Sequence, residues 1–341
     1  MAAGESAGAS GAYARSGVDQ AGGDAAVDAL VAALRRTRLD RPSLQVPLPG
    51  HYASVIRLDD ETGLAMSTDT VGTKMVVAER LGRYDTIGID CVAMNANDVV
   101  CVGAEPTAML DFILCGEADP EVFAALGTGL ARGAELAGVE ITGGEVAQVG
   151  EIVTGHELGG TCVGTVRLDS IVTGARVEPG DAVIGLPSSG LHSNGYTLAR
   201  RALADVPYDD ERLGRPLGDV LLEPTEMYVR AALAVLRSDV DVRGLAHITG
   251  GGFDNLLRLG DHVGFEIDDP LPVPAVFDLI AELGAVSETE MYEVFNMGCG
   301  FCCVVAAADE DGALATLREH YPAARRIGRA TEPPALVRRL G

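Results

Sequence analysis

The pattern of apolar and polar positions predicts helices alternating with short strands along most of the chain. Apolar residues recur at helical spacing in six segments, at 24–38, 74–81, 86–102, 120–137, 196–203 and 253–259. Short apolar or alternating runs predict six strands, at 63–68, 139–142, 161–167, 182–186, 245–248 and 302–307. Asp119 and Pro120 mark a helix start, because aspartate caps free N–H groups and proline is tolerated in the first turn. The pattern therefore predicts an α/β (α+β) chain.

Breaks in this pattern predict two domains. A polar stretch that contains Gly and Pro at 169–180 separates the two halves, and 341 residues suit two sizeable cores. We place the N-terminal domain at 13–172 and the C-terminal domain at 173–341. Residues 1–12 are mostly Ala, Gly and Ser, so we expect a disordered tail there.

The segment 86–102 contains polar residues that do not suit so apolar a helix. Asp90, Asn97 and Asp98 fall on one helical face, and that face has no Lys, Arg or Glu. Carboxylates on such a helix are costly unless they line a cleft, pair with a cation or bind a metal. An ordinary solvated face is the alternative.

Three glycine-containing loops follow predicted strands and precede predicted helices. They are the turn at 69–73, the Gly/Ser loop at 187–195 and the glycines of 249–252. Free N–H groups at a helix start bind anions without a cation, which suits phosphate. A plain tight turn would explain three consecutive glycines equally well.

Charge limits the kinds of partner and points to one unusual residue. The net charge of −24 disfavours nucleic acid as a partner, because a phosphate backbone would be repelled. Lys74 is the only lysine among 26 basic residues, and it stands beside Asp69 in the first glycine turn. A compact ammonium suits contact with one phosphate oxygen. The alternative is that codon bias in the genome left a single lysine without a functional reason.

Cysteine usage favours a cytoplasmic protein. The seven cysteines are odd in number and dispersed, and a chain of this size needs no disulfides. Cys299 and Cys302 have the spacing of a redox pair, but they open an apolar run and are interpreted as buried packing residues. No apolar stretch is long enough for a membrane span, so we expect no membrane partner.

The acidic residues in apolar and glycine-rich segments suggest a nucleotide-binding site. Oxygen ligands such as Asp69, Asp90, Asp98 and Glu145 suit Mg²⁺ that carries a polyphosphate, with Asn97 beside them. With Lys74 and the glycine loops they predict an enzyme that uses ATP, although the chain has no P-loop motif. His192 and His247 each adjoin a glycine loop, and a substrate contact or a structural role remains possible for both.

The order of these motifs resembles the phosphoribosylformylglycinamidine cyclo-ligases, a family of PurM-like proteins. The resemblance extends from Tyr13 to about Gly328. It rests on Gly17-Val18-Asp19, Thr68-Asp69-x-Val71-Gly72-Thr73-Lys74, Asp85-Thr86-Ile87-Gly88-Ile89-Asp90, Asn97-Asp98, Gly103-Ala104-Glu105-Pro106, Gly143-Gly144-Glu145, Ser188-Ser189-Gly190-x-His192-Ser193-Asn194-Gly195, Thr249-Gly250-Gly251-Gly252 and Phe295-Asn296-x-Gly298-x-Gly300.

The resemblance implies a fold, a reaction and an assembly. The N-terminal domain would form a β-barrel across a homodimer, with the C-terminal α/β domain packed outside. The enzyme would use ATP, Mg²⁺ and K⁺ to phosphorylate the formyl amide oxygen of formylglycinamidine ribonucleotide. Ring closure would then give aminoimidazole ribonucleotide, ADP and phosphate in purine biosynthesis.

The resemblance also implies roles for individual residues. The catalytic residues would be Lys74, Asp90, Glu145 and His192. The nucleotide would contact Asp69, Gly72, Thr73, Lys74 and Asn97. The phosphoribosyl substrate would contact Ser189, His192, Ser193, Asn194, His247, Gly250, Gly251 and Gly252. The metal ligands would be Asp69, Asp90, Asp98 and Glu145.

Three departures from the family pattern leave the substrate open. Thr70 stands in place of a usual glycine, the run 144–150 differs, and 46–55 lacks a usual Gly-Gly-Phe-Gly loop. A divergent ATP-dependent paralogue acting on a related substrate is therefore one alternative. A non-catalytic nucleotide-binding dimer is another, although its expected mark would be the loss of the acids.

Overall fold

The computed structural model describes residues 20–34 and 43–339, and it contains two six-stranded sheets. In the first sheet the strand order is β1-β2-β3-β6-β4-β5. Its strands are β1 Gln45–Val46, β2 Ser54–Arg57, β3 Thr62–Thr70, β4 Glu105–Cys115, β5 Glu140–Gln148 and β6 His156–Arg167. All pairs are antiparallel except β4 with β5, which is parallel.

The second sheet has the order β12-β9-β11-β7-β10-β8. Its strands are β7 Ala182–Pro187, β8 Val242–His247, β9 Gly264–Ile267, β10 Cys299–Val305, β11 Arg325–Thr331 and β12 Val337–Arg339. The first sheet thus ends at Arg167 and the second begins at Ala182, and we refer to the two parts as the N-terminal and C-terminal halves.

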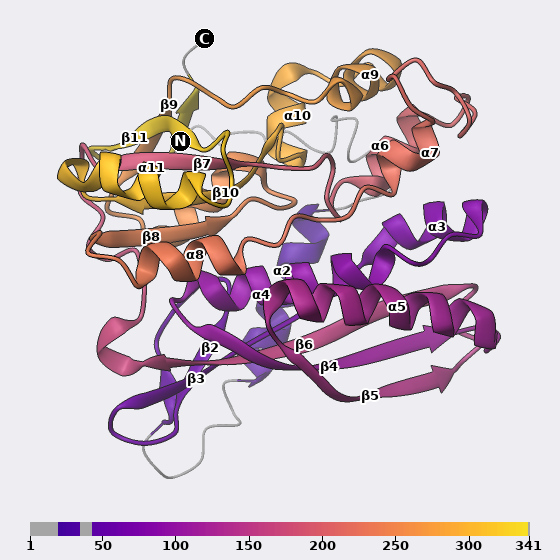
Figure 1. The fold of residues 1–341 in the computed structure, drawn as a ribbon, viewed down its shortest axis with the longest axis horizontal. Coiled ribbons are helices and arrows are strands. Elements are labelled where there is room, and N and C mark those ends of the chain that lie inside the picture. The colour runs from indigo at the N-terminus through magenta and orange to yellow at the C-terminus, as the bar shows by residue number, and fades with distance from the viewer. Residues whose placement is uncertain (1–19, 35–42, 340–341) are drawn as a thin grey trace, which may run out of the picture.

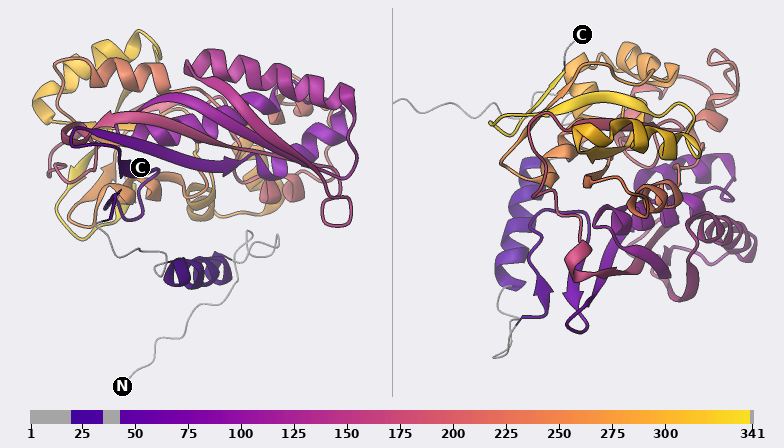
Figure 2. Two further views of the ribbon diagram at one scale, coloured as in Figure 1. Left: turned by 90° about the horizontal axis from the view of Figure 1, so that it is seen from below. Right: turned by 60° about the vertical axis from the view of Figure 1, so that its left-hand side comes forward.

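Helices of the N-terminal half cover one face of the first sheet. They are α3 Met75–Leu81, α4 Ile87–Cys101 and α5 Pro120–Ala137, which lie between this sheet and the C-terminal half (Figure 1). The opposite face of the sheet has no helix on it within the described residues. Helix α2 Gln20–Leu34 stands apart from both sheets in the left view of Figure 2.

The C-terminal half surrounds its sheet with short helices. The α-helices are α6 Tyr196–Ala202, α7 Leu217–Leu221, α8 Val229–Leu236, α9 Ala275–Gly284, α10 Glu288–Val294 and α11 Glu310–Arg318. The 3-10 helices within the described residues are η2 Gly72–Lys74, η3 Leu168–Ser170, η4 Gly252–Leu259 and η5 Ala307–Asp309.

Helix α4 is buried on almost every side, which explains its apolar composition. All of its residues except Ile89 and Asp98 are buried, because it packs on the first sheet, on α5 and on β8 and α8 of the C-terminal half. The approach to α5 requires glycine, since a Cβ on Gly88 would lie 2.0 Å from the backbone nitrogen of Leu130. Helix α4 is therefore the shared core element of both halves.

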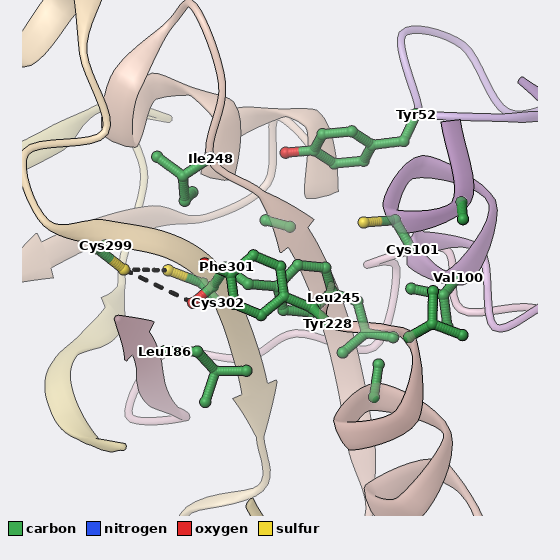
Figure 3. Close-up of a cluster of buried hydrophobic side chains, with 14 of the residues drawn as sticks. Tyr52, Val100, Cys101, Leu186, Tyr228, Leu245, Ile248, Cys299, Phe301 and Cys302 are labelled. Carbon is green, nitrogen blue, oxygen red and sulfur yellow. Dashed lines mark hydrogen bonds between the residues drawn. The ribbon is translucent and has the colours of Figure 1, made fainter. Parts of the chain in front are cut away.

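An apolar joint holds the halves together. In Figure 3, Tyr52, Val100 and Cys101 of the N-terminal half face Tyr228 and Leu245 of the C-terminal half. Tyr228 stacks on Phe301 with ring centroids 5.2 Å apart, and the Tyr52 hydroxyl donates to the Asn255 carbonyl at 2.9 Å. Such packing between halves favours one fixed arrangement over free relative motion.

The structure confirms most predicted elements and corrects several. The strand predicted at 139–142 does not end at Gly143-Gly144-Glu145, because β5 continues to Gln148. The helix predicted at 253–259 is the 3-10 helix η4, and the long strand β4 had not been predicted. The tail at 1–12 and the end of the helix at 24–38 lie outside the described residues.

The cysteine interpretation agrees with the structure. All seven cysteines are buried and none forms a disulfide. Cys299 and Cys302 lie in the buried strand β10 with their Sγ atoms 3.7 Å apart. Within the described part of the chain, no helix is both long and apolar enough to cross a membrane.

Candidate functional site

Lys74 and Asp90 form a buried ion pair between the two halves. Lys74 ends the 3-10 turn η2, and Asp90 lies in the first turn of α4. The ammonium Nζ lies 2.8 Å from each carboxylate oxygen of Asp90, and neither side chain is exposed to solvent. Nζ also donates to the carbonyl oxygens of His192 and Glu223 in the C-terminal half. All three N–H groups of the lysine are therefore used.

The irregular segment 222–228, which we call the strap, accepts one of these hydrogen bonds at Glu223 and also contacts Asp90 and Asn97. Its buried backbone groups cannot use a helix or a sheet and need side-chain partners. Asp90 accepts from the backbone N–H and the hydroxyl of Thr225 at 2.8 and 2.6 Å. Asn97 accepts from the Tyr228 N–H at 2.9 Å and donates to the Glu226 carbonyl at 2.9 Å.

Burial opposes charge on both members of the ion pair. Burial lowers the pKa of Lys74, and the nearby Asp90 counteracts that shift. Burial raises the pKa of Asp90, and Lys74 and the Thr225 hydrogen bonds counteract it. Each charge is thus retained only through its partner, so removal of either one leaves the other without compensation.

This geometry confirms one alternative for the polar face on α4, because Asp90 pairs with a cation, Lys74. Asp90 and Asn97 neither line an open cleft nor form a solvated face, because both are buried against the strap. Lys74 does not present its ammonium to an open surface, where a phosphate could approach. These three side chains therefore connect the halves from within the protein.

Asp69 and Asp98 are the acids that remain partly accessible at the joint. Asp69 lies near the end of β3, and its side chain is on the same face of the strand as that of Ser67. Asp98 lies on α4, which covers this sheet. The Ser67 hydroxyl is 3.4 Å from one oxygen of Asp98. Burial raises the pKa of Asp69, and the negative charge of Asp98 adds to this. Two carboxylates that disfavour each other's charge would both be stabilised by a cation.

Asn95 fixes the backbone that carries Asp69. Its side-chain oxygen accepts from the Asp69 N–H at 2.8 Å, and its amide nitrogen lies 3.3 Å from the Asp69 carbonyl oxygen. The same nitrogen donates to the Cys91 carbonyl within α4 at 2.8 Å. The buried amide therefore ties the strand end to the helix, and sequence analysis had not singled it out.

His247 orients Asp98 from the C-terminal half. Its Nδ1 lies 2.9 Å from a carboxylate oxygen of Asp98, and its Nε2 lies 3.5 Å from the amide nitrogen of Asn97. The Asn97 amide donates toward Nε2, because its oxygen already accepts from Tyr228. The proton of a neutral ring therefore lies on Nδ1 and is donated to Asp98. The ring is completely buried, so it contacts Asp98 rather than solvent.

The four acids predicted to hold a metal do not meet within one chain. Glu145 pairs with Phe112 across β5 and β4, and three strand spacings of about 4.8 Å separate β5 from β3. Its neighbour Gly144 faces Asp111, so the alternation of β5 turns Glu145 to the face without helices. Among the described residues, no three His, Cys, Asp or Glu side chains are grouped for a metal.

The predicted nucleotide turn and substrate loop do lie together. The Ser193 hydroxyl donates to the Val71 carbonyl at 2.9 Å, and the hydroxyls of Thr73 and Thr197 are 3.1 Å apart. Gly72 donates its N–H to Glu157 at 3.0 Å. Loops from the two halves thus contact each other beside the ion pair.

The glycine loop at 250–252 adjoins the same region. A Cβ on Gly250 would lie 3.3 Å from the side-chain oxygen of Asn194, and one on Gly252 would lie 1.8 Å from the Tyr292 carbonyl oxygen. Gly252 also has a φ of +53°. Within the described residues, the N–H groups of Gly250 and Gly251 have no acceptor. These two groups are available to an anion.

His192 and Ser189 have structural contacts in addition to any role with a ligand. His192 is buried with a φ of +63°, and its Nε2 accepts from the Ser189 N–H at 3.3 Å. Burial and the nearby His247 and Lys74 lower its pKa, so the ring is neutral. The Ser189 hydroxyl donates to the Pro224 carbonyl of the strap.

Comparison with protein-family models identifies both halves. Residues 50–166 match the N-terminal domain of AIR synthase related proteins, and residues 178–341 match the C-terminal domain of the same proteins. Together the two matches cover most of the chain.

Curated relatives are similar over nearly the whole chain. A phosphoribosylformylglycinamidine cyclo-ligase of Methanothermobacter thermautotrophicus is 50% identical over 289 residues, which cover 83% of this chain and 84% of the relative. The enzyme of the same name from Thermococcus gammatolerans is 44% identical over 330 residues, covering 95% and 96%.

Solved structures share the fold at low identity. The HypE-HypF complex matches with a TM-score of 0.66 and 18% identity, covering 92% of this chain and 96% of the other. AaThiL complexed with AMPPCP and TMP matches with a TM-score of 0.65 and 16% identity, covering 91% of each chain. T. maritima PurL complexed with ATP matches with a TM-score of 0.58 and 18% identity, covering 84% and 43%.

Replacement of Asp90 by Asn is expected to lower the free energy of unfolding by about 3–5 kcal/mol, because the buried Lys74 ammonium loses its counter-charge. The measurement is urea-induced unfolding followed by circular dichroism. The matched control is Asp169→Asn in the exposed Arg167–Asp169 pair, where the loss should be much smaller because water screens the charges. An Asp90→Asn protein of native stability would show that the pair is not what joins the halves.

Proposed function

The chain belongs to the phosphoribosylformylglycinamidine cyclo-ligase family, and we propose that its active site lies at the joint between the two halves. It is an ATP-dependent ligase of purine biosynthesis. The observation that carries this function is 44% identity over 330 residues to a curated cyclo-ligase, with 95% of this chain covered. The similarity of about one in six residues to HypE, ThiL and PurL structures concerns the fold alone.

The reaction joins two ends of formylglycinamidine ribonucleotide. The γ-phosphoryl group of ATP passes to the formyl amide oxygen, because an amide oxygen is a poor leaving group until it is phosphorylated. A nitrogen on the amidine side then attacks the activated carbon, and phosphate leaves as the imidazole ring closes. Such a sequence requires that nucleotide and substrate be held side by side, away from water.

We assign Asp69 and Asp98 to Mg²⁺. Their oxygen atoms suit this cation, which is often held by only one or two carboxylates together with substrate phosphates. Bound Mg²⁺ would neutralise phosphate charge, which the net charge of −24 otherwise repels. Asn95 and His247 position the two acids, one through the backbone of β3 and one through the carboxylate of Asp98.

We place the nucleotide beside the turn Gly72–Thr73 and the substrate phosphate on the loop 250–252. The free N–H groups of Gly250 and Gly251 support the second assignment, since they can bind an anion in a strongly acidic protein. Ser193 and Asn194 lie between the two loops and would line the substrate. Lys74, Asp90, Asn97 and Ser189 would act through position, because they are bonded within the joint. His192 is held through its Nε2, but its buried Nδ1 has no partner among the described residues and could donate to a bound ligand.

We propose a homodimer formed through the open face of the first sheet. Leu110 of β4 is 52% exposed on this face. Burial of the face against a second copy would close a barrel and bring Glu145 into an enclosed setting. Glu145 would act in the catalytic cleft only through this assembly.

Two further assignments follow from the family and the composition. K⁺ would act as an additional cation, and the domain division stays at 172/173, between the two sheets. Seven buried cysteines without a disulfide support a reducing compartment, so we place the protein in the cytoplasm.

The activity is tested by incubation of the protein with formylglycinamidine ribonucleotide, ATP, Mg²⁺ and K⁺. Aminoimidazole ribonucleotide and ADP should form in equal amounts, measured by liquid chromatography with mass detection. Omission of the ribonucleotide should abolish ADP formation. ATP binding without any imidazole product would instead support a paralogue with another substrate.

Replacement of Asp98 by Asn should remove most turnover, because one of the two proposed Mg²⁺ ligands loses its charge. His247→Gln should raise the Mg²⁺ concentration for half-maximal rate about 10–100-fold, as expected when a partner that orients a ligand is lost. Both values come from Mg²⁺ titrations of the initial rate. Asp239→Asn serves as the control, because Asp239 is exposed and lies outside the proposed site. An unchanged Mg²⁺ dependence in His247→Gln would remove its proposed positioning role.

Replacement of Leu110 by Glu should convert the dimer to a monomer, because a charge would then be buried in the proposed interface. The oligomeric state is measured by sedimentation velocity. Ile152→Glu is the matched control, since Ile152 is 84% exposed and lies outside the strands. Dissociation by both variants would indicate a general effect of the added charge. A Leu110→Glu dimer would exclude this face as the interface.

A further inference from the structure

A cavity lies at the edge of the joint, and neither residue of the ion pair lines it. Its volume is about 230 Å³, and it is lined by the loop with Pro47 and His51, by Thr173, and by Arg258 and His262. None of its ten lining residues is Asp or Glu, although the chain has 50 acidic residues. The cavity includes part of the segment 46–55, which departs from the family pattern.

Arg258 supplies a positive charge without a carboxylate partner. Its guanidinium lies 4.9 Å from the ring centroid of Tyr52, and one nitrogen donates to the Gly50 carbonyl oxygen at 3.3 Å. Within 43–339 and the helix α2, no carboxylate pairs with it. The contact with the Tyr52 ring holds the guanidinium in place and leaves further N–H groups available.

His51 supplies a second donor that has no partner. Its Nδ1 accepts from the Tyr52 N–H at 3.0 Å, so a neutral ring carries its proton on Nε2. Burial and the charge of Arg258 lower the pKa of His51 to about 4, so the ring is neutral near pH 7. The buried Nε2 has no hydrogen-bond partner among the described residues. An oxygen acceptor in the cavity would satisfy it.

Thr173 and Gly260 complete the lining. The Thr173 oxygen accepts from the Ala175 N–H at 3.2 Å, so the hydroxyl hydrogen is free to donate. A Cβ on Gly260 would lie 2.5 Å from the His262 ring, so only glycine allows this ring its position. His262 is held from its other side by a contact of 3.2 Å between Nε2 and the Val177 carbonyl oxygen.

We propose that this cavity binds a phosphate group as a second anion site, separate from the glycine loop at 250–252. Arginine, histidine and threonine donors without an acidic neighbour match a tetrahedral oxyanion. The volume lies below the roughly 300–1,000 Å³ of sites for drug-sized ligands, so an inorganic ion or a terminal phosphate fits and a buried nucleotide does not.

Occupancy of this site would be communicated to the glycine loop through Tyr52. The Tyr52 hydroxyl donates to the Asn255 carbonyl, and the Asn255 side chain accepts from the N–H and hydroxyl of Thr249. Thr249 directly precedes Gly250. An anion that draws Arg258 into the cavity would change its stacking on Tyr52 at the other end of this chain of contacts.

The test is histidine-selective NMR of the intact protein during titration with inorganic phosphate. The chain has six histidines, and His51→Gln and His262→Gln variants assign the two signals of the cavity. Phosphate should shift both signals in a saturable manner and leave the His320 signal unchanged. Phosphate bound on the glycine loop could reach these signals only through Asn255 and Tyr52, so the Arg258→Gln variant, which keeps that loop, separates the two sites.

Arg258→Gln should abolish the shifts, whereas Arg329→Gln removes an exposed arginine elsewhere and should preserve them. Arg258→Lys keeps the charge without the planar fork and should weaken binding at least about fivefold. Equal shifts in the wild type and Arg258→Gln, or their loss in Arg329→Gln, would overturn the proposal. Absence of shifts with both inorganic phosphate and ribose 5-phosphate would overturn it as well.

The two ligands distinguish the source of the phosphate group. Saturation by inorganic phosphate identifies a free ion as the ligand, whereas shifts with ribose 5-phosphate alone identify a phosphate ester. Either result supports the site. The outcome is independent of the cyclo-ligase assay, because neither signal depends on turnover.

Discussion

Helix α4 is the constraint on which the rest of the structure depends. It is enclosed by the first sheet, by α5 and by the C-terminal half, so its few polar side chains must find partners inside the protein. Asp90 accepts hydrogen bonds from Lys74 and Thr225, and Asn97 forms hydrogen bonds with the backbone of the strap. Because these partners come from both halves, the same interactions that satisfy the helix also set the position of one half on the other.

The candidate site is a consequence of this joint. Once the halves are fixed, the turn at 71–74 meets the loop at 189–197, and His247 reaches Asp98 from the opposite side. The acids that remain accessible are those at the rim of the joint, and the buried ones serve its rigidity. A reaction with two sequential steps benefits from such rigidity, because both reactants must keep their orientation while the phosphoryl group moves.

The sequence predicted the element types well wherever one periodicity dominated. Asp119 and Pro120 predicted the start of α5, and the apolar runs predicted the strands β7, β8 and β10. It was less informative where neighbours decide the outcome. Glycines in β5 resembled a strand end, but pairing with β4 carries the strand past them.

For the site, residue type identified which positions are unusual but not what each one contacts. The polar face of α4 was recognised, yet Asp90 and Asp98 differ in burial because the strap covers only one of them. The strap has no hydrophobic periodicity from which its structure could be predicted. Its backbone groups are instead satisfied by side chains that are distant in the sequence. Asn95 was missed for a related reason, because its partner Asp69 is 26 residues away.

The burial of Lys74 has a practical consequence for the chemistry of the surface. Because this is the only lysine and its side chain is fully covered, the folded protein presents no side-chain amine to its surroundings. Acylating metabolites, amine-directed cross-linkers and lysine-specific proteases would all act on this residue only after the two halves separate. The surface therefore relies on arginine for positive charge and is insensitive to modifications that neutralise lysine.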